Sequence, residues 1–240
     1  MADAATVARH RAIWSVRPEL REVYEGWFHR LLGEVEALEP RVEIGSGPGF
    51  FKGFAPRLVA TDALLDPSID VCCDAGVLPF ATGAVGALLL VDVLHHLPRP
   101  LDFLDEAARV LRPGGRLAMM EPWITPASYV LYRYLHHEAC VTDVDIRRPF
   151  DETSKLLFDG NPAIPTLVLR RLGGSRCPLR VRTVEPVMAL DHVASLGFKV
   201  ARSLPSGLVR GARAVERLAR PLRGLFATRA FIVLERVLCD

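Results

Sequence analysis

Residues 41–49 read Arg-Val-Glu-Ile-Gly-Ser-Gly-Pro-Gly, and residues 58–62 read Leu-Val-Ala-Thr-Asp. The first four residues predict a short buried strand that runs into a turn with glycines at positions 45, 47 and 49. Glycine tolerates positive φ and lets the backbone approach a ligand closely. The second stretch predicts the next strand, which ends in Asp62. A glycine turn beside a strand-terminal acid is typical of a nucleoside pocket, in which the acid accepts hydrogen bonds from ribose hydroxyls.

The spacing of the glycines distinguishes two kinds of cofactor. The dinucleotide fingerprint is Gly-x-Gly-x-x-Gly, and it opens a helix that receives a pyrophosphate. Here the third glycine comes one residue early, after Pro48, and Glu43 stands just before the turn. Negative charge at that position would repel a pyrophosphate, but it suits a cofactor that carries an amino acid and a sulfonium. The pattern Glu-x-Gly-x-Gly-x-Gly resembles the first motif of the class I S-adenosylmethionine-dependent methyltransferases.

Three later stretches carry the same resemblance, so that it covers residues 41–122. The first is an acid followed by a small residue, Asp74-Ala75, after a predicted strand over 70–74. The second is Val-Leu-His-His-Leu over 93–97, which follows an apolar run typical of a strand buried on both faces. The third is Leu-Arg-Pro-Gly-Gly over 111–115, where a proline and glycines are expected to end a helix before a strand over 116–120.

The resemblance implies an α/β fold with S-adenosylmethionine as cofactor. The expected architecture is a Rossmann-like seven-stranded sheet, mostly parallel, with an antiparallel last strand inserted beside the fifth and helices on both faces. Ligands of such sheets lie beyond the carboxyl ends of the strands. The predicted cofactor-binding residues are Glu43, Gly45, Ser46, Gly47, Gly49, Asp62, Asp74, Ala75, Asp92 and Val93. Asp74 and Ala75 are expected to contact adenine, although Asp74 could instead cap a surface turn.

Candidate catalytic residues are His95, His136 and His137, because imidazole titrates near neutral pH and can act as a general base. His95 could alternatively shape the pocket and pack on the cofactor. A metal-assisted reaction would draw on His136, His137, Glu138 and Asp143. Adjacent histidines do not share a helix face and the spacing of known metal motifs is absent, so no metal ligand is predicted.

Composition supports one cytosolic domain. The chain has 240 residues, half of them apolar, and a net charge of +2, which gives no reason to expect nucleic acid as a partner. The five cysteines form no Cys-x-x-Cys pair, which favours a reducing compartment. Neither a signal peptide nor an apolar run long enough to span a bilayer is visible, and the oligomeric state stays open.

The domain is expected to divide into four parts. An N-terminal helical cap takes residues 1–40, with 1–12 frayed and a helix over 19–38 beside the cofactor pocket. The cofactor-binding half takes 41–122. A substrate lid or insert takes 123–178, with a helix over 123–137, an irregular stretch over 141–162 and a helix over 164–172. The C-terminal strands with a basic helical insert take 179–240.

The basic insert has two interpretations. Apolar residues from Leu208 to Phe226 share one helical face, and five arginines lie mainly off that face. A basic amphipathic segment over 207–226 can lie on an anionic membrane surface. Alternatively, the helix docks on the sheet through its apolar face and its arginines snorkel to water, which is the interpretation we favour.

The sequence therefore predicts a methyltransferase that uses S-adenosylmethionine to methylate a small or lipid-like metabolite, with oxygen preferred as the acceptor atom. Two alternatives remain. One is a nicotinamide-dependent oxidoreductase on a related sheet, which the early third glycine and Glu43 disfavour. The other is a catalytically silent protein that binds S-adenosylmethionine as a partner.

Overall fold

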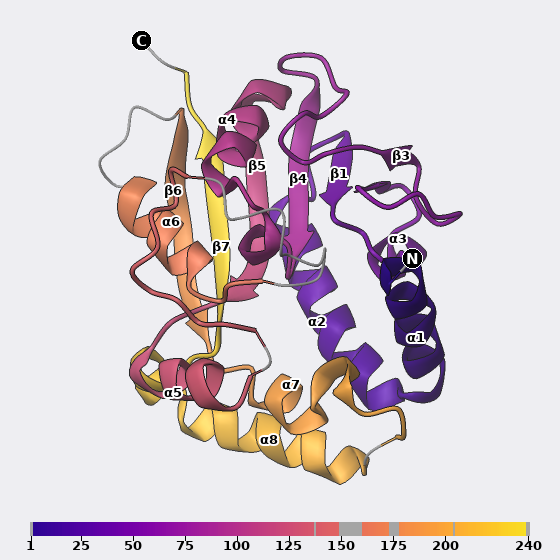
Figure 1. Ribbon diagram of the computed structural model, residues 1–240, viewed down its shortest axis with the longest axis vertical. Coiled ribbons are helices and arrows are strands. Elements are labelled where there is room, and N and C mark those ends of the chain that lie inside the picture. The colour runs from indigo at the N-terminus through magenta and orange to yellow at the C-terminus, as the bar shows by residue number, and fades with distance from the viewer. Residues whose placement is uncertain (1, 137, 149–159, 173–177, 204, 239–240) are drawn as a thin grey trace.

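Seven strands form one sheet in the computed structural model (Figure 1), which describes residues 2–136, 138–148, 160–172, 178–203 and 205–238. The strands are β1 (Arg41–Ile44), β2 (Val59–Asp62), β3 (Val71–Cys72), β4 (Val85–Val91), β5 (Leu111–Pro122), β6 (Leu179–Val187) and β7 (Arg229–Arg236). Their order is β3-β2-β1-β4-β5-β7-β6. All neighbours from β3 to β5 pair in parallel, whereas β7 runs antiparallel between β5 and β6. The predicted sheet, with an antiparallel last strand beside the fifth, is confirmed.

Helices cover both faces of the sheet. They are α1 (Ala2–Val16), α2 (Pro18–Glu34), α3 (Phe50–Phe54), α4 (Pro100–Val110), α5 (Pro126–Tyr134), α6 (Ile164–Leu172), α7 (Leu190–Ser195), α8 (Ser206–Leu218) and α9 (Arg223–Phe226), with 3-10 turns η1 (Leu94–His96), η2 (Gly197–Lys199) and η3 (Arg220–Leu222). Side chains alternate along a strand, so Leu88 and Leu90 of β4 pack with α4 and α6 on one face. Ala87 and Leu89 pack on the other face with α2 and α3.

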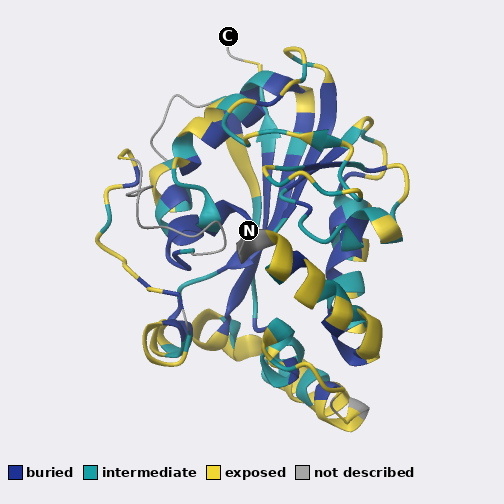
Figure 2. Cartoon of the chain, turned by 45° about the vertical axis from the view of Figure 1, so that its right-hand side comes forward, coloured by how far each residue is buried: buried dark blue, intermediate teal, exposed yellow. Residues whose placement is uncertain are grey.

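The carboxyl ends of the parallel strands meet at one edge of the sheet, and four helices gather there. Because α5 follows β5, α7 follows β6 and α9 leads into the antiparallel β7, the connections place all three at this edge. α8 packs against α7, and α9 packs against α5 (Figure 1). The strands are largely buried, whereas these helices expose much of their outer surface (Figure 2). We call α5, α7, α8 and α9 the cap.

The prediction that residues 1–12 are frayed is wrong. The segment belongs to α1, in which Val7 and Ile13 are buried, and Trp14 stacks on Phe50 with 4.0 Å between the ring centroids. The many alanines favour a helix, and this apolar stripe gives the helix a packing partner. The helix expected over 19–38 is α2, shifted by a residue at its start and ending earlier.

Two further boundaries differ from expectation. The helix α4 already ends at Val110, and residues 111–115 form an irregular start of β5, where the register shifts opposite Val85 and Ala87. Gly114 has a φ of 76°, which a glycine adopts easily and which suits this irregularity. The helix expected over 123–137 is the shorter α5. In the irregular stretch, 141–148 and 160–162 hold no helix or strand, and 149–159 lie outside the described residues.

The favoured interpretation of the basic insert is also wrong. Leu208, Val215 and Leu222 are about half exposed, so the apolar face that was expected to dock on the sheet faces outward. The adjacent face of α8, which carries Val209, packs inward and contacts α7. Helical periodicity shows that a stripe exists, but it does not say on which side the neighbouring element lies.

Candidate cofactor and catalytic site

The glycine loop lies between β1 and α3. The order in which the chain forms the strands reverses here, because β2 and β3 lie on one side of β1 and β4 lies on the other. Gly45, Gly47 and Gly49 have φ values of 67°, 50° and 79°, so all three adopt the left-handed conformation that glycine accepts without strain. A Cβ atom on Gly45 would lie 2.7 Å from Cγ2 of Val93, which seats the loop against the end of β4. A Cβ atom on Gly47 would meet no atom within 4 Å, so the backbone there is open to a ligand.

Asp62, at the end of β2, fastens the glycine loop. Its Oδ2 accepts a hydrogen bond of 2.7 Å from the backbone N–H of Gly47, and its Oδ1 accepts one of 2.8 Å from Leu64. A carboxylate can accept about four hydrogen bonds, so both oxygens keep capacity for a ligand hydroxyl. Asp62 therefore lies at the glycine loop as predicted. The sequence pattern did not indicate its hydrogen bond with the backbone of Gly47.

Asp74 lies past β3, next to the end of β2. It is exposed, and its Oδ1 accepts a 2.6 Å hydrogen bond from the N–H of Gly76. That bond is the turn cap of the alternative interpretation, and it engages only one of the two carboxylate oxygens. Ala75 packs against the core below it.

Glu43 places a carboxyl group inside the protein just before the glycine loop. Its side chain is buried, and Oε2 has no hydrogen-bond partner among the described residues. The buried Ser46 hydroxyl likewise has none. Burial raises the pKa of Glu43 to about 8, and the nearby Ser46 hydroxyl opposes the rise. A buried acceptor without a partner is costly, so this pair of atoms indicates a place where a ligand supplies the donor.

The helix α1 holds the loop from the other side. Arg11 donates through Nη2 to the carbonyl of Pro48 at 3.3 Å and to Oγ of Ser68 at 2.9 Å, and it forms an ion pair with Asp66. This contact holds the pKa of Asp66 well below its usual range. Sequence reasoning missed Arg11, because a single arginine in an alanine-rich segment carries no pattern.

Asp92 lies just past β4 in a strained conformation. Its φ is 58°, in the left-handed region that costs a non-glycine residue about 1 kcal/mol. The carboxylate forms an ion pair with Arg229 at the start of β7. Burial lowers the pKa of Arg229 to about 10, and its guanidinium lies 5.3 Å from the ring of Trp27. An ion pair with the buried Arg229 thus fixes the strand end that was predicted to contact the cofactor.

A second buried carboxylate, Glu121, organises the catalytic candidate. Its Oε1 accepts hydrogen bonds from the backbone N–H groups of Val93 at 2.7 Å and Leu94 at 2.8 Å. Its Oε2 lies 2.8 Å from Nδ1 of His95. Burial raises the pKa of Glu121 to about 7, and the two backbone donors oppose the rise. One proton shared between Oε2 and Nδ1 leaves Nε2 of His95 as the basic atom.

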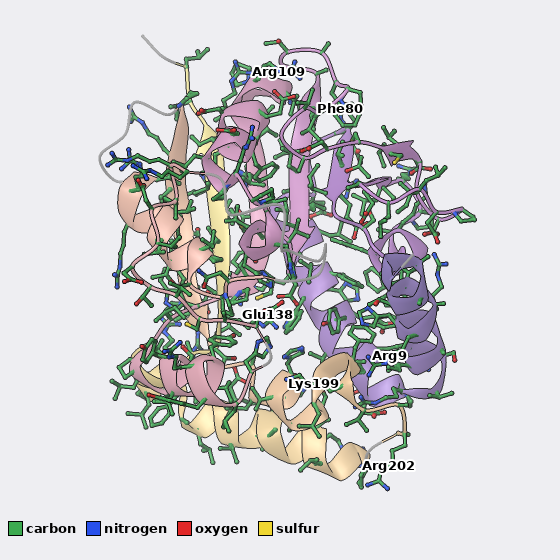
Figure 3. All side chains as sticks on the ribbon, viewed as in Figure 1. Arg9, Phe80, Arg109, Glu138, Lys199 and Arg202 are labelled. Atoms are coloured by element: carbon green, nitrogen blue, oxygen red, sulfur yellow. The ribbon has the colours of Figure 1, made fainter. Side chains whose placement is uncertain are left out.

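Glu138, which is labelled in Figure 3, contacts histidines of two segments at the carboxyl edge of the sheet. Its carboxylate lies 3.8 Å from Nε2 of His95, 3.8 Å from Nε2 of His96 and 3.6 Å from Nδ1 of His136. The structure therefore joins two of the predicted catalytic histidines through Glu138. The third, His137, lies outside the described residues.

The same side chains have the spacing that a metal ion could use. His95, His96 and Glu138 bring one ligand atom each within 4.8 Å of one another, and so do Asp92, His95 and Glu121. In the second set, Glu121 is occupied by two backbone donors and Asp92 by Arg229. Only the contact between Nδ1 of His95 and Oε2 of Glu121 has hydrogen-bond length, whereas the contacts of Glu138 with the histidines are 3.6–3.8 Å long.

The family model described as "Methyltransferase domain" matches residues 42–119, which hold β1 to β4, the glycine loop and most of β5. This third of the chain is therefore similar to the methyltransferase domains of class I enzymes. The fold agrees: a geranyl diphosphate C-methyltransferase from Streptomyces coelicolor superposes with a TM-score of 0.54 at 17% identity, covering 89% of this chain and 79% of that one.

Two curated relatives match the chain over part of their length. An uncharacterized 37.1 kDa protein in transposon TN4556 of Streptomyces fradiae is 31% identical over 197 residues, 70% of this chain and 53% of that protein. The 27-O-demethylrifamycin SV methyltransferase of Amycolatopsis mediterranei is 39% identical over 54 residues, 22% of this chain and 20% of that enzyme. The chain thus spans about half the length of the first relative and a fifth of the second.

The site offers donors and acceptors that fit S-adenosylmethionine. The unpartnered Oε2 of Glu43 suits an ammonium group, and the open space at Gly47 admits a nucleoside close to the backbone. The structure adds Arg11, Glu121 and Arg229 to the residues that sequence reasoning found. Glu121 directly follows a predicted strand and precedes Pro122. An acid at the carboxyl end of a strand was the sequence signal that could have marked Glu121 as a site residue.

Proposed function

We propose that the protein transfers a methyl group from S-adenosylmethionine to a hydroxyl group of a small or lipid-like metabolite. The observation that carries the proposal is the meeting, at one sheet edge, of the glycine loop, an unpartnered buried Glu43 and the His95–Glu121 pair. When bound, the cofactor supplies an electrophilic methyl carbon on a good thioether leaving group. The protein therefore has to align the reactants and remove a proton.

The glycine loop and four acids form the cofactor site. Glu43 accepts from the amino group of its methionine part, and Asp62 accepts from the ribose hydroxyls. Asp74 and Ala75 hold the adenine edge. Gly45 and Gly47 let the backbone approach, while Ser46 and Gly49 shape the turn, and Asp92 with Val93 forms the wall at the end of β4.

His95 serves as the general base through Nε2. Glu121 holds Nδ1 at 2.8 Å and so fixes both the ring orientation and the tautomer with a basic Nε2. His136 and Glu138 extend this network on the acceptor side. The relative named 27-O-demethylrifamycin SV methyltransferase supports an oxygen acceptor on a metabolite, whereas the structural neighbour acts on carbon, so the preference for oxygen rests on His95.

Calorimetric titration with S-adenosylhomocysteine and, separately, with NAD tests the cofactor. We expect binding of S-adenosylhomocysteine and none of NAD; NAD binding alone would support the oxidoreductase and refute the proposal. A panel of hydroxyl, amine and activated-carbon acceptors with radiolabelled S-adenosylmethionine tests the reaction. Cofactor binding without transfer to any acceptor would favour the silent partner protein.

The affinity for S-adenosylhomocysteine is expected to rise with pH up to about pH 8, by as much as tenfold per pH unit. Glu43, whose pKa is raised to about 8, is neutral in the free protein below that pH, and binding an ammonium group releases its proton. Titrations at pH 6, 7 and 8, in buffers of different ionisation enthalpy, measure the affinity and the released proton.

The Glu43→Gln variant isolates this carboxyl. It is expected to bind more weakly at pH 8 and to lose the pH dependence, whereas Glu36→Gln, on an exposed residue, keeps the wild-type profile. An unchanged pH profile in Glu43→Gln would refute the role of Glu43 as the acceptor for the amino group.

Three broader predictions stay open to experiment. The division into an N-terminal cap, a cofactor-binding half, a substrate lid and a C-terminal part is one, and the cytosolic location predicted from the cysteines is another. The third is a small or lipid-like acceptor as the partner, with the oligomeric state open. Among the described residues, no helix combines the length and apolar character needed to cross a membrane.

A further inference from the structure

The outer side of the cap combines exposed apolar residues with arginines. On α8, η3 and α9, six apolar side chains are between 45% and 85% exposed: Leu208, Val215, Leu218, Leu222, Leu225 and Phe226. On α5, which packs against α9, and at the residue that ends it, four more are between 37% and 73% exposed, namely Tyr129, Val130, Tyr134 and Leu135. Single exposed apolar residues need no explanation, but a run of this kind on adjoining helices marks an interaction surface.

The charge on this surface has one sign. Between Ser206 and Phe226 the sequence holds five arginines and a single acid, Glu216, and α5 holds Arg133 and no acid. Glu216 is turned toward the protein, where it accepts hydrogen bonds from the N–H groups of Ala189 and Leu190. The outward side of the cap is therefore apolar and cationic.

Two of the five arginines form no ion pair within the described part of the chain. Arg213 pairs with Asp191, and Arg223 pairs with Glu185. Arg217 and Arg220 form no ion pair with another residue in the described part of the chain, and both line an open cavity of about 390 Å³ between β6 and the cap. None of the glycine-loop residues lines this cavity.

We infer that the outer side of α5, α8 and α9 binds an anionic membrane surface. Apolar side chains flanked by arginines are the composition with which an interfacial helix lies on a bilayer, with the apolar face among the acyl chains and the arginines at the phosphates. Tyrosines such as Tyr134 favour the same interface. Arg217 and Arg220 are exposed on the same segment as Leu218 and Leu222, so they contact the lipid headgroups when these leucines enter the bilayer.

The position of this surface suggests what membrane binding would do for the protein. The cap lies over the carboxyl edge of the sheet, where Glu138 and His95 meet. A protein lying on the bilayer with its cap would hold that edge close to the lipid phase. The inference concerns binding alone and stands whether or not the proposed reaction is correct.

Co-sedimentation of the full chain with vesicles tests the inference. One set contains phosphatidylcholine only, and the other contains phosphatidylcholine with about a third phosphatidylglycerol. We expect at least tenfold stronger binding to the anionic vesicles in low salt and a marked loss at high salt, because headgroup attraction is screened within a Debye length. Recovery at background with both vesicles would overturn the inference.

Two pairs of variants locate the surface. Arg217→Glu with Arg220→Glu should lower binding to the anionic vesicles by at least tenfold, and Leu218→Asp with Leu222→Asp should lower it in both salt conditions. The matched control, Arg57→Glu with Arg112→Glu, makes the same change of charge on exposed residues away from the cap and should bind like wild type. Loss of binding in the control to the same extent would refute the cap as the site.

Sedimentation velocity without lipid distinguishes a membrane from a second copy of the chain. We expect the same sedimentation coefficient across a hundredfold range of concentration. A concentration-dependent dimer that Leu218→Asp with Leu222→Asp abolishes, together with background recovery on vesicles, would assign the surface to self-association and overturn the inference.

Discussion

Replacing His95 with alanine is expected to lower kcat for a hydroxyl acceptor by about 10²- to 10⁴-fold, the usual contribution of a general base. The physical reason is the fixed imidazole: Nδ1 lies 2.8 Å from Oε2 of Glu121, which leaves Nε2 to take the proton of the acceptor. Affinity for S-adenosylhomocysteine should stay within about twofold of wild type. Steady-state kinetics with the best acceptor of the panel, and calorimetry with S-adenosylhomocysteine, measure both quantities.

The Glu121→Gln variant tests whether the tautomer of His95, and not only its presence, determines kcat. The amide oxygen can still accept from the N–H groups of Val93 and Leu94, but the amide NH₂ then faces Nδ1 of His95. A donor at that position favours the tautomer with its proton on Nε2, which removes the base while the ring keeps its place. We therefore expect kcat to fall nearly as far as in His95→Ala, with KM little changed.

The control is His29→Ala, on an exposed histidine of α2, which should leave kcat unchanged. An undiminished kcat in His95→Ala would refute its role as base and with it the preference for oxygen. Treatment with EDTA should not change the rate, because the network needs no ion. Loss of activity on chelation, with recovery on adding Zn²⁺ or Mg²⁺, would instead identify His95, His96 and Glu138 as metal ligands.

The parts of the fold that local sequence determines could be predicted. The bounds of β1 and α6 agree with expectation, and the three loop glycines have the positive φ for which glycine is suited. Strand order followed from the resemblance, because the motifs recur in register over 41–122. In each of these cases the deciding residues are neighbours in the chain, or repeat at a fixed spacing.

The contacts that assemble the site could not be predicted in this way. Glu121 meets His95 across 26 residues, and Arg229 meets Asp92 only because the last strand is inserted beside β5. Neither pair leaves a periodic signal. The prediction for the apolar face of α8 was wrong for a related reason. The apolar stripe is visible in the sequence, but the side of the helix that packs inward depends on the position of α7.

The second large effect concerns stability and comes from a contact of this non-local kind. Arg17→Ala is expected to lower the free energy of unfolding by about 3–5 kcal/mol, because removing one member of a buried charged network leaves the other groups unpaired. Arg17 is fully buried at the junction of α1 and α2. Its Nε donates to Glu19 at 2.8 Å, and its Nη atoms donate to the carbonyls of Ser195, Gly197 and Val200 at 2.6–2.9 Å.

This network joins the N-terminal helices to the turn after α7, so its loss should loosen the cap as well as α1. Urea unfolding followed by circular dichroism measures the free energy, and a Tm lower by roughly 10 °C is expected for a chain of this size. The control Arg202→Ala, an exposed arginine of the same region, should change stability by less than about 0.5 kcal/mol (Figure 3).

A double variant separates the ion pair from the carbonyl contacts. In Arg17→Met with Glu19→Leu, no buried charge is left unpaired, which often restores stability when an ion pair alone is at stake. Here three carbonyl oxygens still lose their donor, so we expect the double variant to recover only part of the loss. Full recovery would show that the Glu19 contact dominates, and wild-type stability in Arg17→Ala would refute the network as a joint between α1, α2 and the cap.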